Sequence, residues 1–135
     1  MANTAPIFVL TPNVGWTAAI TAANTAYDGT GTVTLAWTAG ASGGFINKIR
    51  FQAMGTNAQT LARVFLNNGA TNTTATNNTL IVEAGLPSSA SSNVLPIPPF
   101  EIPLNLVVQA GYRIYITLAT AVAAGYIATV FGGDY

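Results

Sequence analysis

The sequence predicts an all-β protein: a single-domain, jelly-roll-like antiparallel β-sandwich of about eight strands. Two observations predict this fold class. Segments with apolar side chains at every second position recur about every ten residues, separated by turns rich in Gly, Asn and Pro. No segment shows the i, i+3, i+4 apolar pattern with capping residues that marks an amphipathic helix. The chain of 135 residues is long enough for one domain with its own core.

Three strands are predicted in the first part of the chain. A short one near residues 7–10 is limited by Pro6 and Pro12, whose nitrogens cannot donate a backbone hydrogen bond. The second, residues 30–38, places three apolar residues on one face: Val33, Leu35 and Trp37. The third, residues 45–54, places four residues on the inner face: Phe45, Ile49, Phe51 and Ala53.

Turn signals delimit the central strands. Residues 61–66 are apolar on both faces except at Arg63, and the Asn-Asn-Gly sequence at 67–69 tolerates the positive φ angles of a tight turn. Residues 80–84 alternate again, with Glu83 on the outer face. The stretch 87–99 contains four prolines, which remove donors from a strand ladder, so it is predicted to be a long loop.

The last three predicted strands are residues 100–108, 112–120 and 127–131. Pro103 interrupts the first of them and predicts an edge strand or a β-bulge. In the second, three residues are expected to face a core: Ile114, Ile116 and Leu118. The twenty uncharged residues between Arg113 and Asp134 are long enough for a membrane span, but their period of two favours strands, and we expect a C-terminal β-hairpin.

Charge is scarce in this chain. It is 50% hydrophobic and 6% charged, with four basic and four acidic residues and no net charge. Average soluble domains carry about a quarter charged residues. Because so little charge protects poorly against self-association, we expect permanent partners, whereas a neutral, threonine-rich monomer is the alternative. The balanced charges also leave no positive surface for nucleic acid.

The N-terminal residues 1–22 are predicted to be an extended segment and residues 23–135 the β-sandwich domain. No basic residue precedes the first apolar run, and that run is shorter than the core of about 7–15 residues in a signal peptide. We therefore expect a protein made in the cytoplasm without a signal peptide. The run itself is a candidate interaction arm, formed by Ile7, Phe8, Val9 and Leu10.

The sequence offers little for catalysis. It contains no histidine and no cysteine, which excludes thiolate catalysis and the His- or Cys-based metal sites. Glu83 and Glu101 lie on predicted strands, could be neighbours on one sheet, and would be the carboxylate pair of a glycosidase. The alternative is that they form ion pairs, across the sheet or a subunit interface, with the basic residues Lys48, Arg50, Arg63 and Arg113. We expect the ion pairs, and therefore no enzyme activity, cofactor or metal.

Several phrases of the chain resemble a group of small phage-encoded virion proteins, several of them head decoration (cement) proteins. These phrases are, in order, DGTGTV, SGGFINKIRF, GTNAQTLARVFLNNG, NNTLIVEAGLP and FEIPLNLVVQAGYRIYITLATAVAAG. The resemblance covers about residues 23–135 and implies a homotrimer on the outer surface of a virion capsid, where it bridges major capsid subunits. It implies no reaction and no membrane partner.

A second function stays open beside this one. Exposed aromatic rings can stack on sugars, so the chain could be a tail-fibre or appendage domain that binds a host glycan. The candidate aromatic residues are Trp16, Tyr27, Trp37, Tyr112, Tyr115 and Tyr126.

Overall fold

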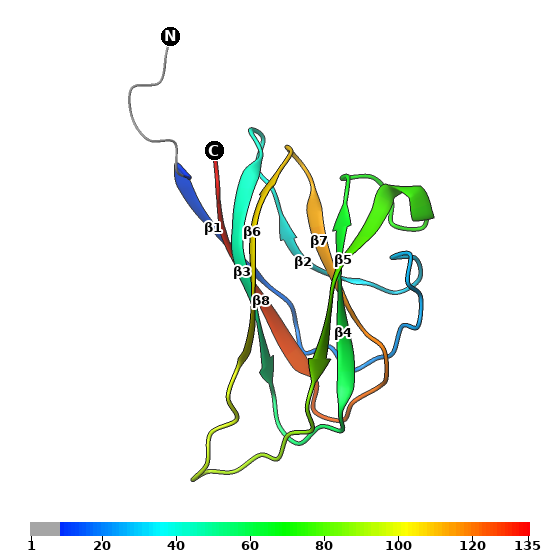
Figure 1. Ribbon diagram of the computed structural model, residues 1–135, viewed down its shortest axis with the longest axis vertical. Coiled ribbons are helices and arrows are strands. Elements are labelled where there is room, and N and C mark those ends of the chain that lie inside the picture. Colours follow the sequence, from blue (N-terminus) through cyan, green and yellow to red (C-terminus); the bar gives the residue numbers. More distant parts are fainter. Residues whose placement is uncertain (1–8) are drawn as a thin grey trace.

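The computed structural model describes residues 9–135 and shows eight strands in two packed sheets (Figure 1). The strands are β1 (Thr11–Trp16), β2 (Thr34–Thr38), β3 (Gly44–Ala53), β4 (Thr60–Asn67), β5 (Asn78–Leu86), β6 (Phe100–Val108), β7 (Arg113–Leu118) and β8 (Tyr126–Asp134), and a short 3-10 helix, η1 (Ala75–Asn77), precedes β5. One sheet has the order β1-β8-β3-β6 and the other has the order β2-β7-β4-β5. All the strand pairs in both sheets are antiparallel.

The strand pairing has the nested order of a jelly roll. β4 pairs with β5, β3 with β6, β2 with β7 and β1 with β8, and successive pairs in this series fall in alternate sheets. A long hairpin rolled in this way produces two Greek keys in a double sheet. The prediction of an all-β, jelly-roll-like sandwich is confirmed.

The core between the sheets is built from alternate residues of the strands. Trp37 and Phe51 are its largest fully buried side chains, and Ile114, Ile116 and Leu118 of β7 are completely buried, as predicted. The only polar atom of Trp37, the indole nitrogen Nε1, donates a 3.0 Å hydrogen bond to the carbonyl of Asn13.

Two β-bulges change which residues face the core. In β3 the register shifts between Ile46 and Lys48, so Ile46 and Ile49 are both fully buried although they are three residues apart. Phe45 consequently lies on the outer face, and its predicted inward position is wrong. A second register shift lies in β2, between Leu35 and Trp37, and Leu35 is 47% exposed. The predicted inward position of Leu35 is therefore wrong as well.

The two C-terminal strands do not form the expected hairpin. β7 lies in the sheet with β2 and β4, whereas β8 lies in the other sheet between β1 and β3. The connecting residues 119–125 pass from one sheet to the other, and the Val122 amide donates to the Thr21 carbonyl at 3.0 Å. The expectation for β6 is confirmed, because it is an edge strand and has a register shift next to Pro103.

The sandwich begins inside the segment that was expected to be an extended arm. β1 lies within residues 1–22, and it pairs along its whole length with β8. Residues 11–16 therefore belong to the sandwich and not to an arm. Ile7 and Phe8 lie outside the described residues. Val9 and Leu10 precede β1, and the Leu10 amide donates to the Asp134 carbonyl of β8 at 2.8 Å. No helix within residues 9–135 has the length and apolar character of a membrane span.

Candidate functional site

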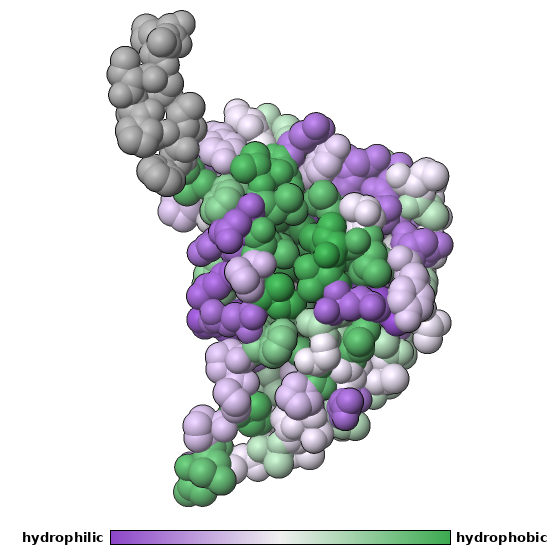
Figure 2. Space-filling view, in the orientation of Figure 1, coloured by the Kyte–Doolittle hydropathy of each residue, from purple (hydrophilic) through white to green (hydrophobic). Residues whose placement is uncertain are grey.

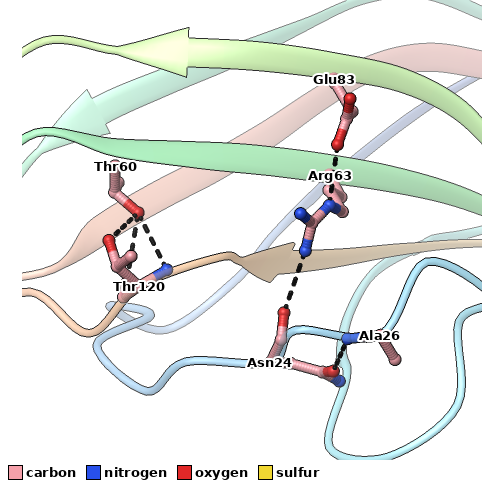
Figure 3. Close-up of polar contacts among 6 residues, drawn as sticks. All are labelled: Asn24, Ala26, Thr60, Arg63, Glu83 and Thr120. Atoms are coloured by element: carbon pink, nitrogen blue, oxygen red, sulfur yellow. Dashed lines mark hydrogen bonds and ion pairs between the residues drawn. The ribbon is translucent and has the colours of Figure 1, made fainter.

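The outer face of the β2-β7-β4-β5 sheet is covered by the chain itself. Part of the connection from β1 to β2, residues 24–31, lies across this face and is held by Arg63 of β4. The Arg63 side chain is buried, its Nε donates to Glu83 at 2.8 Å, and its Nη1 donates to the carbonyl of Asn24 at 3.3 Å (Figure 3). The guanidinium also lies 3.9 Å from the centre of the Tyr27 ring.

Further contacts fix this covering connection. The side-chain amide of Asn72 donates to the carbonyls of Gly29 and Gly31, at 3.2 and 3.0 Å, and Asn78 donates to the carbonyl of Asp28 at 3.1 Å. The hydrogen bond to Glu83 is the main cause that raises the pKa of Arg63 above its ordinary value. The covering connection lies over three outward-facing residues of the sheet that are buried: Phe65, Asn67 and Thr117.

The outer face of the β1-β8-β3-β6 sheet has no such cover within the described residues, and it carries an apolar groove of about 740 Å³. No lining side chain is charged: the groove is lined by Val9, Val14, Phe45, Asn47, Asn105, Val107, Phe131, Gly132 and Tyr135. Val107 is 62% exposed, so a large apolar side chain lies open to solvent at this place. We call this site the outer groove.

Local backbone features create the outer groove. The β-bulge of β3 turns Phe45 and Asn47 outward, and Asn105 of β6 adopts a left-handed φ of 49°, which Asn tolerates better than most residues. At Gly133 an added Cβ would lie 2.5 Å from the Val9 side chain. The glycine therefore allows Val9 to pack directly over β8.

A cluster of three charges flanks the outer groove. Glu101 accepts from Lys48 Nζ at 3.0 Å and from Arg50 Nη2 at 2.7 Å. Both cations also lie over the ring of Phe131, which lines the groove, at 5.3 and 5.1 Å from its centre. The hydrogen bond from Lys48, followed by that from Arg50, lowers the pKa of the Glu101 carboxyl. The apolar groove thus has a charged margin with defined geometry.

The structure tests where the other predicted site residues lie. Glu83 and Glu101 are on different sheets, so the alternative in which they are neighbours on one sheet is excluded. The predicted ion pairs are confirmed for Lys48, Arg50 and Arg63, all within one chain. Arg113 forms no ion pair with the described residues, and its Nη1 lies 3.5 Å from the Tyr115 hydroxyl. Of the candidate arm, Val9 lines the outer groove and Leu10 is exposed.

The sandwich is open along one long side and closed along the other. Figure 2 shows a continuous hydrophobic area over the region between β6 and β5. The half-buried apolar residues of these two strands that pack against the core are Ile81, Val82, Ile102, Leu104 and Leu106. On the opposite side, Asn13 of β1 donates to the carbonyl of Thr38 in β2 at 2.9 Å. Apolar surface therefore lies on both sides of β6, in the outer groove and at the open side.

A protruding loop carries a further apolar surface. Residues 87–99 form the lower end of the molecule in Figure 1, and the tip of this end is hydrophobic in Figure 2. Val94 and Leu95 are its most exposed apolar residues. The base of the loop is fixed, since Ser89 Oγ donates to the carbonyl of Gly55 at 2.7 Å and Gln52 Nε2 donates to the carbonyl of Ile97 at 3.1 Å.

Three of the six aromatic residues that could stack on sugars are buried or stacked on another side chain. Trp37 and Tyr126 are buried, and Tyr27 is stacked with Arg63. Trp16 is the most exposed of the six candidates, at 68%, and lies beside Leu35 in a shallow hollow between β1 and β2. The described residues contain no group of three or more His, Cys, Asp or Glu side chains that could hold a metal ion.

Sequence reasoning missed the principal members of the outer groove. The period-two pattern places Phe45 in the core, and it marks Val107 and Phe131 only as members of alternating strands. The adjacent apolar residues Val107 and Val108 were the available signal, because two successive side chains of a strand face opposite ways and one of them must leave the core.

Comparison with protein-family models, with curated proteins and with solved structures finds no match to this chain.

Proposed function

We propose that this chain is a structural virion protein, a decoration (cement) protein that bridges major capsid subunits on the outer surface of a phage head. In this proposal the protein is made in the host cytoplasm and assembles as a homotrimer. One observation supports it most strongly: one sheet is partly covered by its own chain, whereas the other presents an apolar groove without charged side chains, and further apolar side chains lie at the open side of the sandwich.

Apolar surface of this kind stabilises an assembly when a partner covers it. Each Å² removed from water contributes about 25 cal/mol before the cost of association is subtracted. The charged residues beside the groove would orient a partner but add little to its affinity, because Lys48 and Arg50 already form ion pairs with Glu101. The choice of a capsid as the second partner rests on the resemblance of the sequence to decoration proteins.

Two measurements test the proposal. In sedimentation equilibrium at micromolar concentration the purified protein is expected to be a trimer, without a stable folded monomer. Capsids prepared without this protein are expected to bind it and to resist heat better afterwards. A monodisperse monomer of 13.9 kDa that does not co-sediment with capsids would contradict the proposal.

The exposed Trp16 favours a second candidate, an appendage domain that binds a host glycan. Its test is binding to host surface polysaccharide by the original protein and by a Trp16→Ala variant. Saturable binding that this substitution abolishes would favour the glycan over the capsid.

A further inference from the structure

We propose, on the basis of the homotrimer proposed above, that the open side of the sandwich between β5 and β6 is the surface with which each copy of this chain binds the next copy. In the trimer the open sides face the three-fold axis, and the β6 margin of one subunit lies against the β5 margin of its neighbour. The apolar side chains of the copies then form one shared core.

The core of the sandwich reaches the surface at the open side. Among the described residues, eight apolar side chains are half-buried against the core, and five of them lie on β5 and β6. Figure 2 shows a continuous hydrophobic area over the region between these two strands. Interfaces of obligate oligomers resemble a domain core that has been cut in half, and the open side has this character.

The opposite side of the sandwich is closed by contacts within the chain. Asn13 of β1 donates to the carbonyl of Thr38 in β2 at 2.9 Å, and the carboxylate of Asp134 accepts from the Gly40 amide at 3.0 Å. Trp37, which donates to the Asn13 carbonyl, is buried there. Within residues 9–135 no backbone hydrogen bond joins β5 to β6, so the core is left accessible on this side alone.

The charges beside the open side are compatible with contact between identical copies. β5 and β6 carry one charged residue each, Glu83 and Glu101. Glu83 is paired with Arg63 at 2.8 Å, and Glu101 is paired with Lys48 and Arg50 at 3.0 and 2.7 Å. Because both carboxylates have their cations in their own chain, identical copies approach without placing unpaired like charges against each other.

The backbone of the two strands favours side-chain packing over the addition of an extended peptide. In β6, Pro103 has no N–H group and Asn105 has a left-handed φ of 49° at the register shift. In β5, the pairing with β4 shifts between Leu80 and Val82, so Ile81 is bulged. An added strand needs a continuous row of backbone donors and acceptors, and both edges are interrupted. The partner that fits is therefore another surface of apolar side chains, such as the open side of a second copy.

Because the chain contains no cysteine, thiol cross-linking tests the interface directly. Val82→Cys is introduced into one full-length chain and Leu104→Cys into another that carries a size tag, and both keep a small apolar side chain. The two chains are co-expressed and treated with a short bifunctional thiol reagent. The expected product is a covalent pair of one tagged and one untagged chain. In the control, Leu35→Cys replaces Leu104→Cys; Leu35 is exposed on β2, at the opposite edge of its sheet from β5, and should not cross-link.

The other outcomes separate this inference from the proposed function. A trimer whose Val82→Cys and Leu104→Cys chains do not cross-link overturns the inference and leaves the proposed function intact. Cross-linking of Leu104→Cys to capsid protein, and not to another copy, also overturns the inference, because the open side then faces the capsid. A full-length protein that sediments as a monomer contradicts the proposed function itself, and the inference with it.

A charge placed on the open side gives an independent measurement. Leu104→Asp in the full chain is expected to raise the trimer dissociation constant about tenfold or more, because a carboxylate without a cation would be buried between subunits. Val14→Asp adds the same charge to an exposed residue of β1, in the same sheet but at its other edge, and is expected to change the constant much less. Equal dissociation constants for Leu104→Asp and the original protein contradict the inference. If Leu104→Asp does not fold, the cross-linking of the cysteine variants decides.

Discussion

The guanidinium of Arg63 lies 3.9 Å from the centre of the Tyr27 ring, with Glu83 on its Nε, and so fastens the β1–β2 connection to one sheet. This contact decides which face of the sandwich remains free. Residues 24–31 of this connection cover part of the outer face of the β2-β7-β4-β5 sheet. The uncovered sheet is therefore the one that presents the outer groove.

Removal of Glu83 is expected to destabilise the protein more than removal of Glu101. Glu83→Ala leaves the buried Arg63 charge without its carboxylate, which costs about 2–4 kcal/mol of unfolding free energy. Glu101→Ala removes a carboxylate from solvent-accessible pairs and is expected to change stability little. Urea unfolding of the two variants compares these free energies, and similar losses would show that Arg63 is not held by Glu83.

Acid is expected to weaken the contacts of Glu101. Lys48 and Arg50 lower the pKa of this carboxyl below its ordinary value of 4.5, so the folded state holds the carboxylate more firmly than the unfolded chain does. The stability from this group is fully present above about pH 4.5 and is lost as the pH falls through the lower, folded-state pKa. Acid unfolding curves of the original protein and of Glu101→Gln should therefore converge at low pH, and a constant separation would argue against this assignment.

Two glycine substitutions should differ sharply. At Gly15 an added Cβ would collide with the backbone carbonyl of Ala36, where β1 approaches β2, so Gly15→Ala is expected to cost about 2 kcal/mol or more. At Gly85 a Cβ would meet nothing within 4 Å, so Gly85→Ala is the matched control and should change stability by less than about 0.5 kcal/mol. Thermal unfolding measures both, and a neutral Gly15→Ala would show that the two edge strands can separate freely.

Asn57 is expected to be essential to the lower end of the sandwich. Its buried side chain accepts from the amides of Ala124 and Gly125, each at 2.8 Å, and donates to the Gly125 carbonyl at 3.0 Å. Asn57→Ala leaves these groups unpaired and should lower the unfolding free energy by about 2–4 kcal/mol. The exposed Asn93 supplies the control, since Asn93→Ala is expected to be neutral. Comparable stability of the two variants would mean that water replaces the lost hydrogen bonds.

Deletion of residues 121–135 is expected to abolish folding. These residues include β8, which lies between β1 and β3, so its loss would separate β1 from its sheet and expose the core. Far-ultraviolet circular dichroism checks this, and a strand-rich spectrum for the shortened protein would contradict it. A C-terminal hairpin would lead to the same prediction, but here the reason is the central position of β8 in its sheet.

Sequence patterns were sufficient to predict the fold class, most of the strands and ion pairing by Lys48, Arg50 and Arg63, although not which carboxylate each of them contacts. Alternation with a period of two shows which side chains lie on the same face of a strand, and it correctly places Ile114, Ile116 and Leu118 in the core. Pro103 likewise identified an edge strand, because a missing donor can be tolerated there.

The order of the strands in each sheet and the identity of the uncovered face depend on tertiary contacts. Alternation carries no information about which sheet a strand joins, so β7 and β8 looked like a hairpin although they lie in different sheets. A β-bulge inserts one residue and reverses the phase of alternation, which is why Phe45 was assigned to the core and in fact lines the outer groove. The cover over one sheet depends on contacts between residues far apart in the chain, such as Arg63 with Tyr27, and no local pattern encodes their meeting.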